Sequence, residues 1–163
     1  MLQKEIIMEN ADFIIYQENS LFGLKDKSGN IIIPPQYTNF NPFSCGLAMV
    51  RNASLQYAYI NIDNTQIIPF GLYSWCDSSF CWGLARAVKD GKWGIINTQG
   101  NIILPFQFDK IYPLKDEYIF RIKTFINENE YILDINKILY NYTLPDGLIY
   151  IKTFPIDSFK KLY

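Results

Sequence analysis

The side chains that could perform acid–base chemistry in this sequence are carboxylates, because none of its 163 residues is a histidine. Without histidine the commonest general base is missing, and so is every Ser-His or Cys-His pair that activates a nucleophile. A pair of carboxylates could still act as the acid and the base of a hydrolase. The candidate carboxylates are Asp26, Asp63, Asp77, Asp109, Asp116 and Glu117.

Local context favours structural roles for these acids. Asp26 opens the segment Asp-Lys-Ser-Gly, where an aspartate ordinarily bonds the backbone of its own turn. Asp109 belongs to a repeated pattern of the sequence, so we expect it to hydrogen-bond to the next repeat. The glycines are isolated, which leaves no phosphate-cradling or calcium-binding loop. We therefore predict that the protein is not an enzyme and has no cofactor, and a carboxylate-based hydrolase remains only a remote alternative.

The cysteines predict neither a disulfide framework nor a metal site. They are Cys45, Cys76 and Cys81, and an odd number argues against a set of paired disulfides. Cys76 and Cys81 are close in the chain, but a zinc site needs four ligands, and neither histidine nor a second close cysteine pair is present. We expect reduced thiols and no bound metal.

An aromatic segment before Gly83 is the best candidate for recognition. The interval from Pro34 to Gly46 is 12 residues, whereas the corresponding interval from Pro69 to Gly83 is 14. Insertions into repeats usually form loops on one face, often the binding face, and tyrosine and tryptophan anchor many interfaces. The predicted partner-binding residues are Tyr73, Trp75, Asp77, Ser78 and Phe80.

The other two tryptophans have different expectations. Trp93 belongs to the repeated pattern and should lie in the core. Trp82 has two interpretations, an interface anchor or a side chain packed under the next hairpin. Stacking on single-stranded nucleic acid would need a cationic groove, yet the only charge near Trp75 is Asp77. With 15 basic and 16 acidic residues, the net charge of −1 favours neither a nucleic-acid nor a membrane partner.

These side chains sit on a sequence that repeats itself. Residues 22–34 read FGLKDKSGNIIIP, and residues 93–105, 71 positions later, read WGIINTQGNIILP. Midway between them, residues 57–69 read YAYINIDNTQIIP. A period of about 35 residues is typical of repeat proteins, in which each unit buries its apolar face against its neighbours.

Each repeat parses into three short strands. The first opens with an aromatic residue followed by Gly23, Ala58 or Gly94, which indicates close packing at that position. The following turn ends in glycine or asparagine, as a positive φ requires. An isoleucine-rich second strand follows and should end at proline, since proline has no N–H to donate.

After the proline, apolar residues spaced by three predict one helical or 3₁₀ turn, as in Tyr37, Phe40 and Phe43. A third strand begins with Gly-Leu-Ala at residues 46 and 83, and in the third repeat it is expected at 117–121. Residues 13–16 should form a lone third strand that caps the N-terminus. Residues 131–135 and 137–140 suggest a shortened hairpin, and residues 147–151 resemble another third strand.

The fold prediction is therefore all-β: stacked three-stranded antiparallel units of about 35 residues in an elongated repeat architecture. A single domain should span 1–163. Its predicted parts are an N-terminal cap strand (1–20), repeat 1 (21–56), repeat 2 (57–91), repeat 3 (92–122), and a degenerate repeat with a C-terminal cap (123–163).

These residues resemble the WG repeat, a bacterial β-repeat with the pattern G-K-W-G-[YIL]-I-[DN]-x-x-G-x-[IV]-[IV]-x-P-x-x-[YF]-D, followed later by F-x-x-G-L-A-x-V. Residues 91–97 read GKWGIIN and match it closely, as do Pro105, Phe108 and Asp109. The second repeat departs from it, with Tyr57-Ala58 in place of the Trp-Gly pair. The resemblance implies a binding or scaffold module with no common catalytic residues.

We therefore predict a non-catalytic protein-binding module in the bacterial cytoplasm. Its specific form would be an immunity protein that neutralises a toxin domain. The alternative is a structural or envelope-associated scaffold that assembles through its end repeats. No segment approaches the roughly 18 uninterrupted apolar residues of a membrane span, and no secretory signal is visible at the N-terminus. The partner's identity, the binding face and the oligomeric state are not specified by the sequence.

Overall fold

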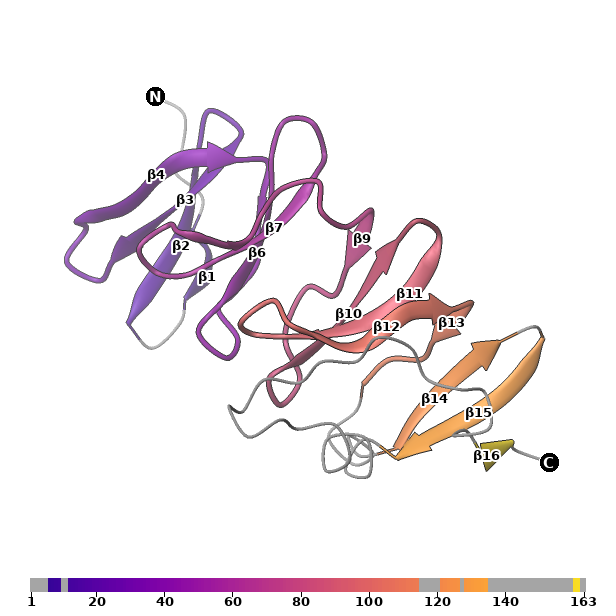
Figure 1. Cartoon of the computed structure of the whole chain (residues 1–163). Coiled ribbons are helices and arrows are strands. Elements are labelled where there is room, and N and C mark those ends of the chain that lie inside the picture. Colours follow the sequence, from indigo (N-terminus) through magenta and orange to yellow (C-terminus); the bar gives the residue numbers. More distant parts are fainter. Residues whose placement is uncertain (1–5, 10–11, 115–120, 127, 135–159, 162–163) are drawn as a thin grey trace. The chain divides into compact units, whose positions relative to one another are not determined.

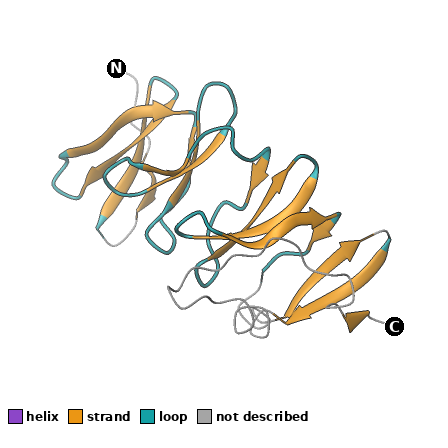
Figure 2. Ribbon diagram, viewed as in Figure 1, coloured by secondary structure: helices purple, strands orange, loops and turns teal. Residues whose placement is uncertain are grey.

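The computed structural model describes residues 6–9, 12–114, 121–126, 128–134 and 160–161, and it contains strands and loops but no helix among them (Figures 1 and 2). The strands form four sheets, each with four strands in sequence order and with antiparallel neighbours. The all-β prediction is confirmed. The predicted helical turn at Tyr37–Phe43 is wrong, because Tyr37 ends one strand and Phe40 lies in the next.

Each sheet is a simple up-and-down arrangement. The first sheet comprises β1 (Ile6–Glu9), β2 (Phe13–Glu18), β3 (Leu21–Asp26) and β4 (Ile31–Tyr37). The second comprises β5 (Asn39–Phe40), β6 (Ala48–Arg51), β7 (Tyr57–Ile60) and β8 (Gln66–Ile68). The third comprises β9 (Trp75–Cys76), β10 (Leu84–Lys89), β11 (Lys92–Asn97) and β12 (Ile102–Phe108). The fourth comprises β13 (Lys110–Ile111), β14 (Arg121–Ile126), β15 (Asn129–Asp134) and β16 (Lys160–Lys161).

The sheets are out of phase with the sequence repeats. The third strand of one repeat pairs with the first strand of the next, as β6 does with β7 and β10 with β11. A two-residue strand adds a fourth member at one edge of the second, third and fourth sheets. Residues 13–16, expected as a lone cap, lie in β2 and pair with both β1 and β3. The first sheet therefore combines the N-terminal segment with repeat 1, and the second and third sheets each combine two consecutive repeats.

Proline ends the second strand of a repeat in only one of three cases. β8 stops at Ile68, before Pro69, as expected. β4 and β12 instead continue through Pro34 and Pro105 to Tyr37 and Phe108. Both ladders shift register at this point, since Leu24 pairs with Ile33 but Phe22 pairs with Tyr37. A bulge of this kind leaves residues without ladder bonds, so a proline is accommodated there.

The chain forms two compact units, residues 1–73 and residues 74–163. In the first unit, one apolar cluster draws on both sheets: Ile15, Leu24, Ile33, Tyr37, Phe40, Ala48, Val50, Ala58 and Ile60. A hydrogen bond from the Tyr37 hydroxyl to Asn64 Oδ1 (2.5 Å) also links β4 to the turn after β7. In the second unit, the buried side chains include Ile95, Ile96, Leu104, Phe108 and Ile111. The domain boundaries expected from the sequence remain predictions.

Several predictions concern the C-terminal part. Of the strand expected at 117–121, only Arg121 lies among the described residues, and it begins β14, which pairs with β15. β15 covers most of the expected strand at 131–135. Residues 137–140 and 147–151, and the acids Asp116 and Glu117, lie outside the described residues. Within the described ranges, no helix is long and apolar enough to cross a membrane.

Candidate protein-binding site

The five residues predicted to bind a partner have very different surroundings. Tyr73 is 6% exposed in the first unit and Phe80 is 5% exposed in the second, so both side chains serve the core. Ser78 is exposed, while Trp75 and Asp77 are partly buried. Trp75 and Asp77 come together around a residue that the sequence analysis did not select, Arg86 of β10.

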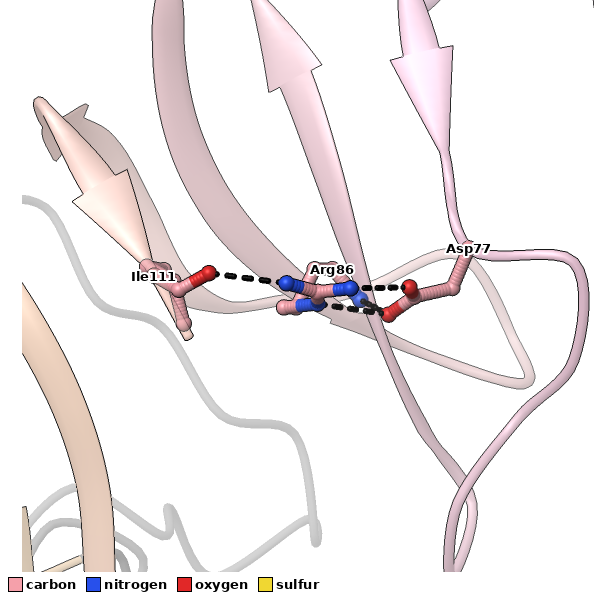
Figure 3. Close-up of polar contacts among 3 residues, drawn as sticks. All are labelled: Asp77, Arg86 and Ile111. Atoms are coloured by element: carbon pink, nitrogen blue, oxygen red, sulfur yellow. Dashed lines mark hydrogen bonds and ion pairs between the residues drawn. The ribbon is translucent and has the colours of Figure 1, made fainter. Parts of the chain in front are cut away.

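Arg86 is the one charged side chain that is buried in the part of the chain described by the structure, at 9% exposure. Its Nε donates to Asp77 Oδ2 (3.0 Å) and its Nη2 to Asp77 Oδ1 (2.7 Å), a two-pronged ion pair (Figure 3). The backbone N–H of Arg86 donates to the same Oδ2 (2.8 Å), and Nη1 donates to the Ile111 carbonyl of β13 (2.9 Å). Such pairing offsets the large cost of burying a guanidinium.

Two tryptophans lie close to the same guanidinium. The Arg86 Cζ lies 5.3 Å from the ring centroid of Trp75 and 5.2 Å from that of Trp93. The two rings are themselves 5.0 Å apart and tilted by 47°. A cation within about 6 Å of an aromatic face is attracted by the ring quadrupole. Trp93, which was expected in the core, is only partly buried. It belongs to a charged cluster, which we call the Arg86 cluster (Trp75, Asp77, Arg86 and Trp93).

The preceding sheet forms the corresponding backbone hydrogen bond with uncharged side chains. There Asn41 N donates to the Met49 carbonyl (2.9 Å), as Asp77 N does to the Arg86 carbonyl (3.0 Å). Asn41 thus corresponds to Asp77 and the buried Met49 to Arg86. Because the backbone bond is the same with either pair, it does not depend on the carboxylate and the guanidinium.

The loop that follows Asp77 ends in a tight turn with Trp82 at its tip. We call Cys81–Leu84 the Trp82 turn; Cys81 and Leu84 exchange backbone hydrogen bonds of 2.8 and 3.0 Å. Trp82 has a φ of +52° and Gly83 one of +79°. This is the left-handed region, where a bulky side chain costs roughly 1–2 kcal/mol. The Trp82 side chain is nevertheless 72% exposed, so it is not packed under the next hairpin.

The turn Ser44–Leu47 has the same form, with Cys45 (φ +51°) in the place of Trp82. Trp82 was not among the five predicted residues. The signal that could have selected it is its position immediately before the repeated Gly-Leu-Ala, which marks the tip of a two-residue turn. The structure locates the two extra residues of the interval from Pro69 to Gly83. One precedes β9, and the other lies between Asp77 and Cys81.

The end of the third sheet that carries Trp82 has little charge. Leu84 pairs with Asn97, so the Trp82 turn and the turn Asn97–Asn101 lie at the same end. That second turn contains only Asn, Thr, Gln and Gly. The equivalent turns carry Asp26 and Lys27 in the first sheet and Asp63 in the second. The exposed indole of Trp82 and an uncharged neighbouring turn therefore distinguish this end of the third sheet from the same end of the first and second sheets.

Two of the other candidate acids, Asp26 and Asp109, make contacts within the fold. Asp26 accepts hydrogen bonds from the N–H and the side-chain amide of Asn30, both at 2.8 Å. The side-chain bond from Asn30 and its backbone bond lower the pKa of Asp26. Asp109, which follows β12, forms an ion pair with Lys92 of β11 (2.5 Å). The expected hydrogen bond from Asp109 to the next repeat remains a prediction. No group of three potential metal ligands was found in the described ranges, and the three cysteines are free thiols.

Comparison with known proteins gives a family. No curated protein matches the sequence. The family model described as "WG containing repeat" matches residues 22–54, 57–93 and 93–123, together more than half of the chain. WG repeats are a repeat family of the binding or scaffold kind and are not known as enzymes. The three matches coincide with the three recurring segments found in the sequence, and the chain belongs to the WG-repeat family.

Proposed function

We propose that this WG-repeat chain is a non-catalytic protein-binding module that contacts its partner through the Trp82 turn. The observation that carries the proposal is Trp82 itself, 72% exposed and held at a φ of +52°. Bulky residues persist in strained conformations where the surroundings impose them, and such residues cluster at functional sites. Tryptophan is also among the residue types most enriched at interface hot spots.

The chemistry around Trp82 suggests the kind of partner surface. Exposed Ser78 and Ser79 precede the turn, and Gln99 is exposed on the neighbouring turn. An aromatic anchor among short hydroxyl and amide side chains resembles the composition of antibody paratopes. Such a surface would suit an apolar pocket rimmed by uncharged polar groups. Because little charge is involved, association would depend weakly on salt.

The specific form that we propose is immunity in the bacterial cytoplasm, in which the module covers and neutralises a toxin domain. This role requires a scaffold with one anchored recognition surface and no chemistry of its own. The expected interface is of standard size, about 1,200–2,000 Å² in total. The proposal rests on the Trp82 surface and on the binding character of the family.

The chain offers a matched pair of variants to test the proposal. Trp82 and Leu55 are both large, exposed and left-handed, at 72% and 61% exposure and φ values of +52° and +61°, but they lie in different units. Asparagine tolerates this conformation, so Trp82→Asn and Leu55→Asn should both relieve backbone strain. Only Trp82→Asn should weaken partner binding, by about 30-fold or more if Trp82 is a hot spot.

The measurement is co-purification and calorimetric titration with the product of the neighbouring gene, followed by growth of cells that express that product as a toxin. Rescue of growth by the wild type and by Leu55→Asn, but not by Trp82→Asn, would support immunity through this surface. Equal binding by both variants would reject the Trp82 turn as the contact. Concentration-dependent oligomers in light scattering, without toxin binding, would favour the structural or envelope-associated scaffold.

A further inference from the structure

The loop that presents Trp82 is held at its base by an ion pair that has no counterpart in the preceding sheet, where Asn41 and Met49 take these positions. Asp77 joins the loop to β10 twice, because its N–H donates to the Arg86 carbonyl and its carboxylate accepts the Arg86 N–H (2.8 Å). Phe80, 5% exposed, anchors the middle of the loop, and the Trp82 turn closes it. Both ends of the segment 78–83 are therefore fixed, and Asp77 fixes the first.

The preceding sheet is an internal control for the role of the charges. It has the same backbone bond and the same tight turn, with Asn41 and Met49 in the positions of Asp77 and Arg86. Its loop is one residue shorter between these features, since Asn41 to Ser44 spans three residues and Asp77 to Cys81 spans four. The ion pair thus accompanies the longer loop and the exposed tryptophan.

We infer that Asp77 and Arg86 are positioning residues, which hold the lengthened loop so that Trp82 is presented in one orientation. The carboxylate fixes the first residue of the loop through three bonds from Arg86. Arg86 is held in turn by its bond to the Ile111 carbonyl (Figure 3). Its guanidinium also lies close to the rings of Trp75 and Trp93. Every donor nitrogen of the side chain thus has a partner in the cluster or in β13.

Local order, and not global stability, is the expected contribution of this pair. Replacing a buried ion pair by uncharged residues of similar size is often neutral or stabilising for a protein as a whole. A two-pronged arginine–carboxylate pair adds geometric specificity instead. This inference rests on the proposed function, since the order of the Trp82 turn matters only if a partner binds the turn.

The test uses the full chain and needs no partner. The double variant Asp77→Asn/Arg86→Met installs the pair found in the preceding sheet. The control, Lys92→Met/Asp109→Asn, removes the exposed ion pair of the same sheet. Native-state amide hydrogen exchange at residues 78–83 and iodide quenching of tryptophan emission report on the loop, and urea unfolding reports on the whole protein.

We expect the double variant to speed exchange at residues 78–83 by about tenfold or more while β10, β11 and the urea midpoint stay near wild type. The control should change none of these. Unchanged exchange at 78–83, or an increase shared by all strands, would overturn the inference. Should the double variant fail to fold, Arg86→Lys keeps the charge without the planar fork, and the same local increase is expected. A partner that binds wild type but not Trp82→Asn would still support the proposed function if this test failed.

Discussion

At the scale of single residues, the glycine of the aromatic–glycine pair is explained by the bulge in the opposite strand. A Cβ on Gly23 would lie 2.5 Å from the Ile33 carbonyl oxygen and 2.8 Å from Pro35 N. A Cβ on Gly94 would lie 2.8 Å from the Leu104 carbonyl oxygen. The second repeat has Ala58 instead, and there β8 ends at Ile68 and has no bulged continuation. The sequence predicted close packing at this position, and the structure identifies backbone as the neighbour.

The first prediction is that Gly23→Ala destabilises the protein far more than Ala58→Gly does. The alanine Cβ would collide with main-chain atoms that cannot rotate away, and overpacking of this kind costs about 1–3 kcal/mol or more. Ala58→Gly removes one buried methyl and adds chain entropy, at a cost of about 1 kcal/mol. Urea unfolding of both variants measures the difference. Equal losses would contradict the bulge explanation.

The second prediction concerns acid. Hydrogen bonds from Asn30 lower the pKa of Asp26, so the folded state holds its carboxylate ionised more firmly than the unfolded chain does. The stability from this difference is present above the unfolded pKa, about 3.9, and is lost as the pH falls below it toward the folded pKa. Asp26→Asn keeps a turn residue found at the equivalent Asn61 and Asn97 but does not titrate.

Urea unfolding from pH 7 to pH 3 should therefore show the wild type losing its advantage over Asp26→Asn below about pH 4. Asp63→Asn is the control, because Asp63 lies in the corresponding turn of the second sheet and Asn61 makes the turn bond there. Parallel pH profiles for the wild type and Asp26→Asn would contradict the assignment.

At the scale of elements, the last strand of one sheet and the first strand of the next are separated by a single residue within each unit. β4 runs along β3 and, one residue after its end at Tyr37, the chain forms β5, the edge strand of the next sheet. β12 and β13 repeat this arrangement in the second unit. The Arg86 cluster adds a side-chain link of the same kind, since Arg86 of the third sheet donates to Ile111 of the fourth. The sequence predicted the strands but not which strands belong to the same sheet, because strand propensity does not specify pairing partners.

The third prediction separates the ion pair from its parts. Arg86→Met alone leaves the Asp77 carboxylate partly buried without its counter-ion, and losses of about 3 kcal/mol are typical of such a change. Adding Asp77→Asn should recover most of that loss, to within about 1 kcal/mol of wild type, because no unpaired charge then remains and the bond from Asn41 N–H to the Met49 carbonyl forms without a charged pair. Urea unfolding of the single and double variants gives the coupling energy. Additive losses would show that the two residues act independently.

At the scale of the whole molecule, the division into two units falls where a longer segment, and not a single residue, separates the last strand of one sheet from the first strand of the next. β8 stops before Pro69, and residues 69–74 lead to β9 without a continuous strand. The first unit has its own apolar cluster, drawn from both of its sheets. A unit with its own core can in principle fold alone, although so short a chain is only marginally stable.

The fourth prediction is that a fragment of residues 1–73 folds by itself into β-structure with a cooperative urea transition at a lower midpoint than the full chain. Far-UV circular dichroism and amide dispersion in NMR spectra would measure this. Ile60→Ala in the fragment serves as the control and should unfold it, since deleting a fully buried isoleucine side chain to alanine costs about 2–5 kcal/mol. A fragment that is unstructured would show that the first unit depends on residues after 73.

The sequence alone determined the repeat, the all-β class, the left-handed turns at Gly29, Asn64 and Gly100, and the family. These depend on periodicity and on conformational preferences of single residues, which are local properties. Only the tertiary structure decided that Tyr73 and Phe80 are buried and that Trp82 is exposed at the tip of its turn. It also decided that Arg86 pairs with Asp77 and lies close to two tryptophan rings. Burial and ion pairing depend on which strands become neighbours, and residues distant in the chain meet only after that pairing is made.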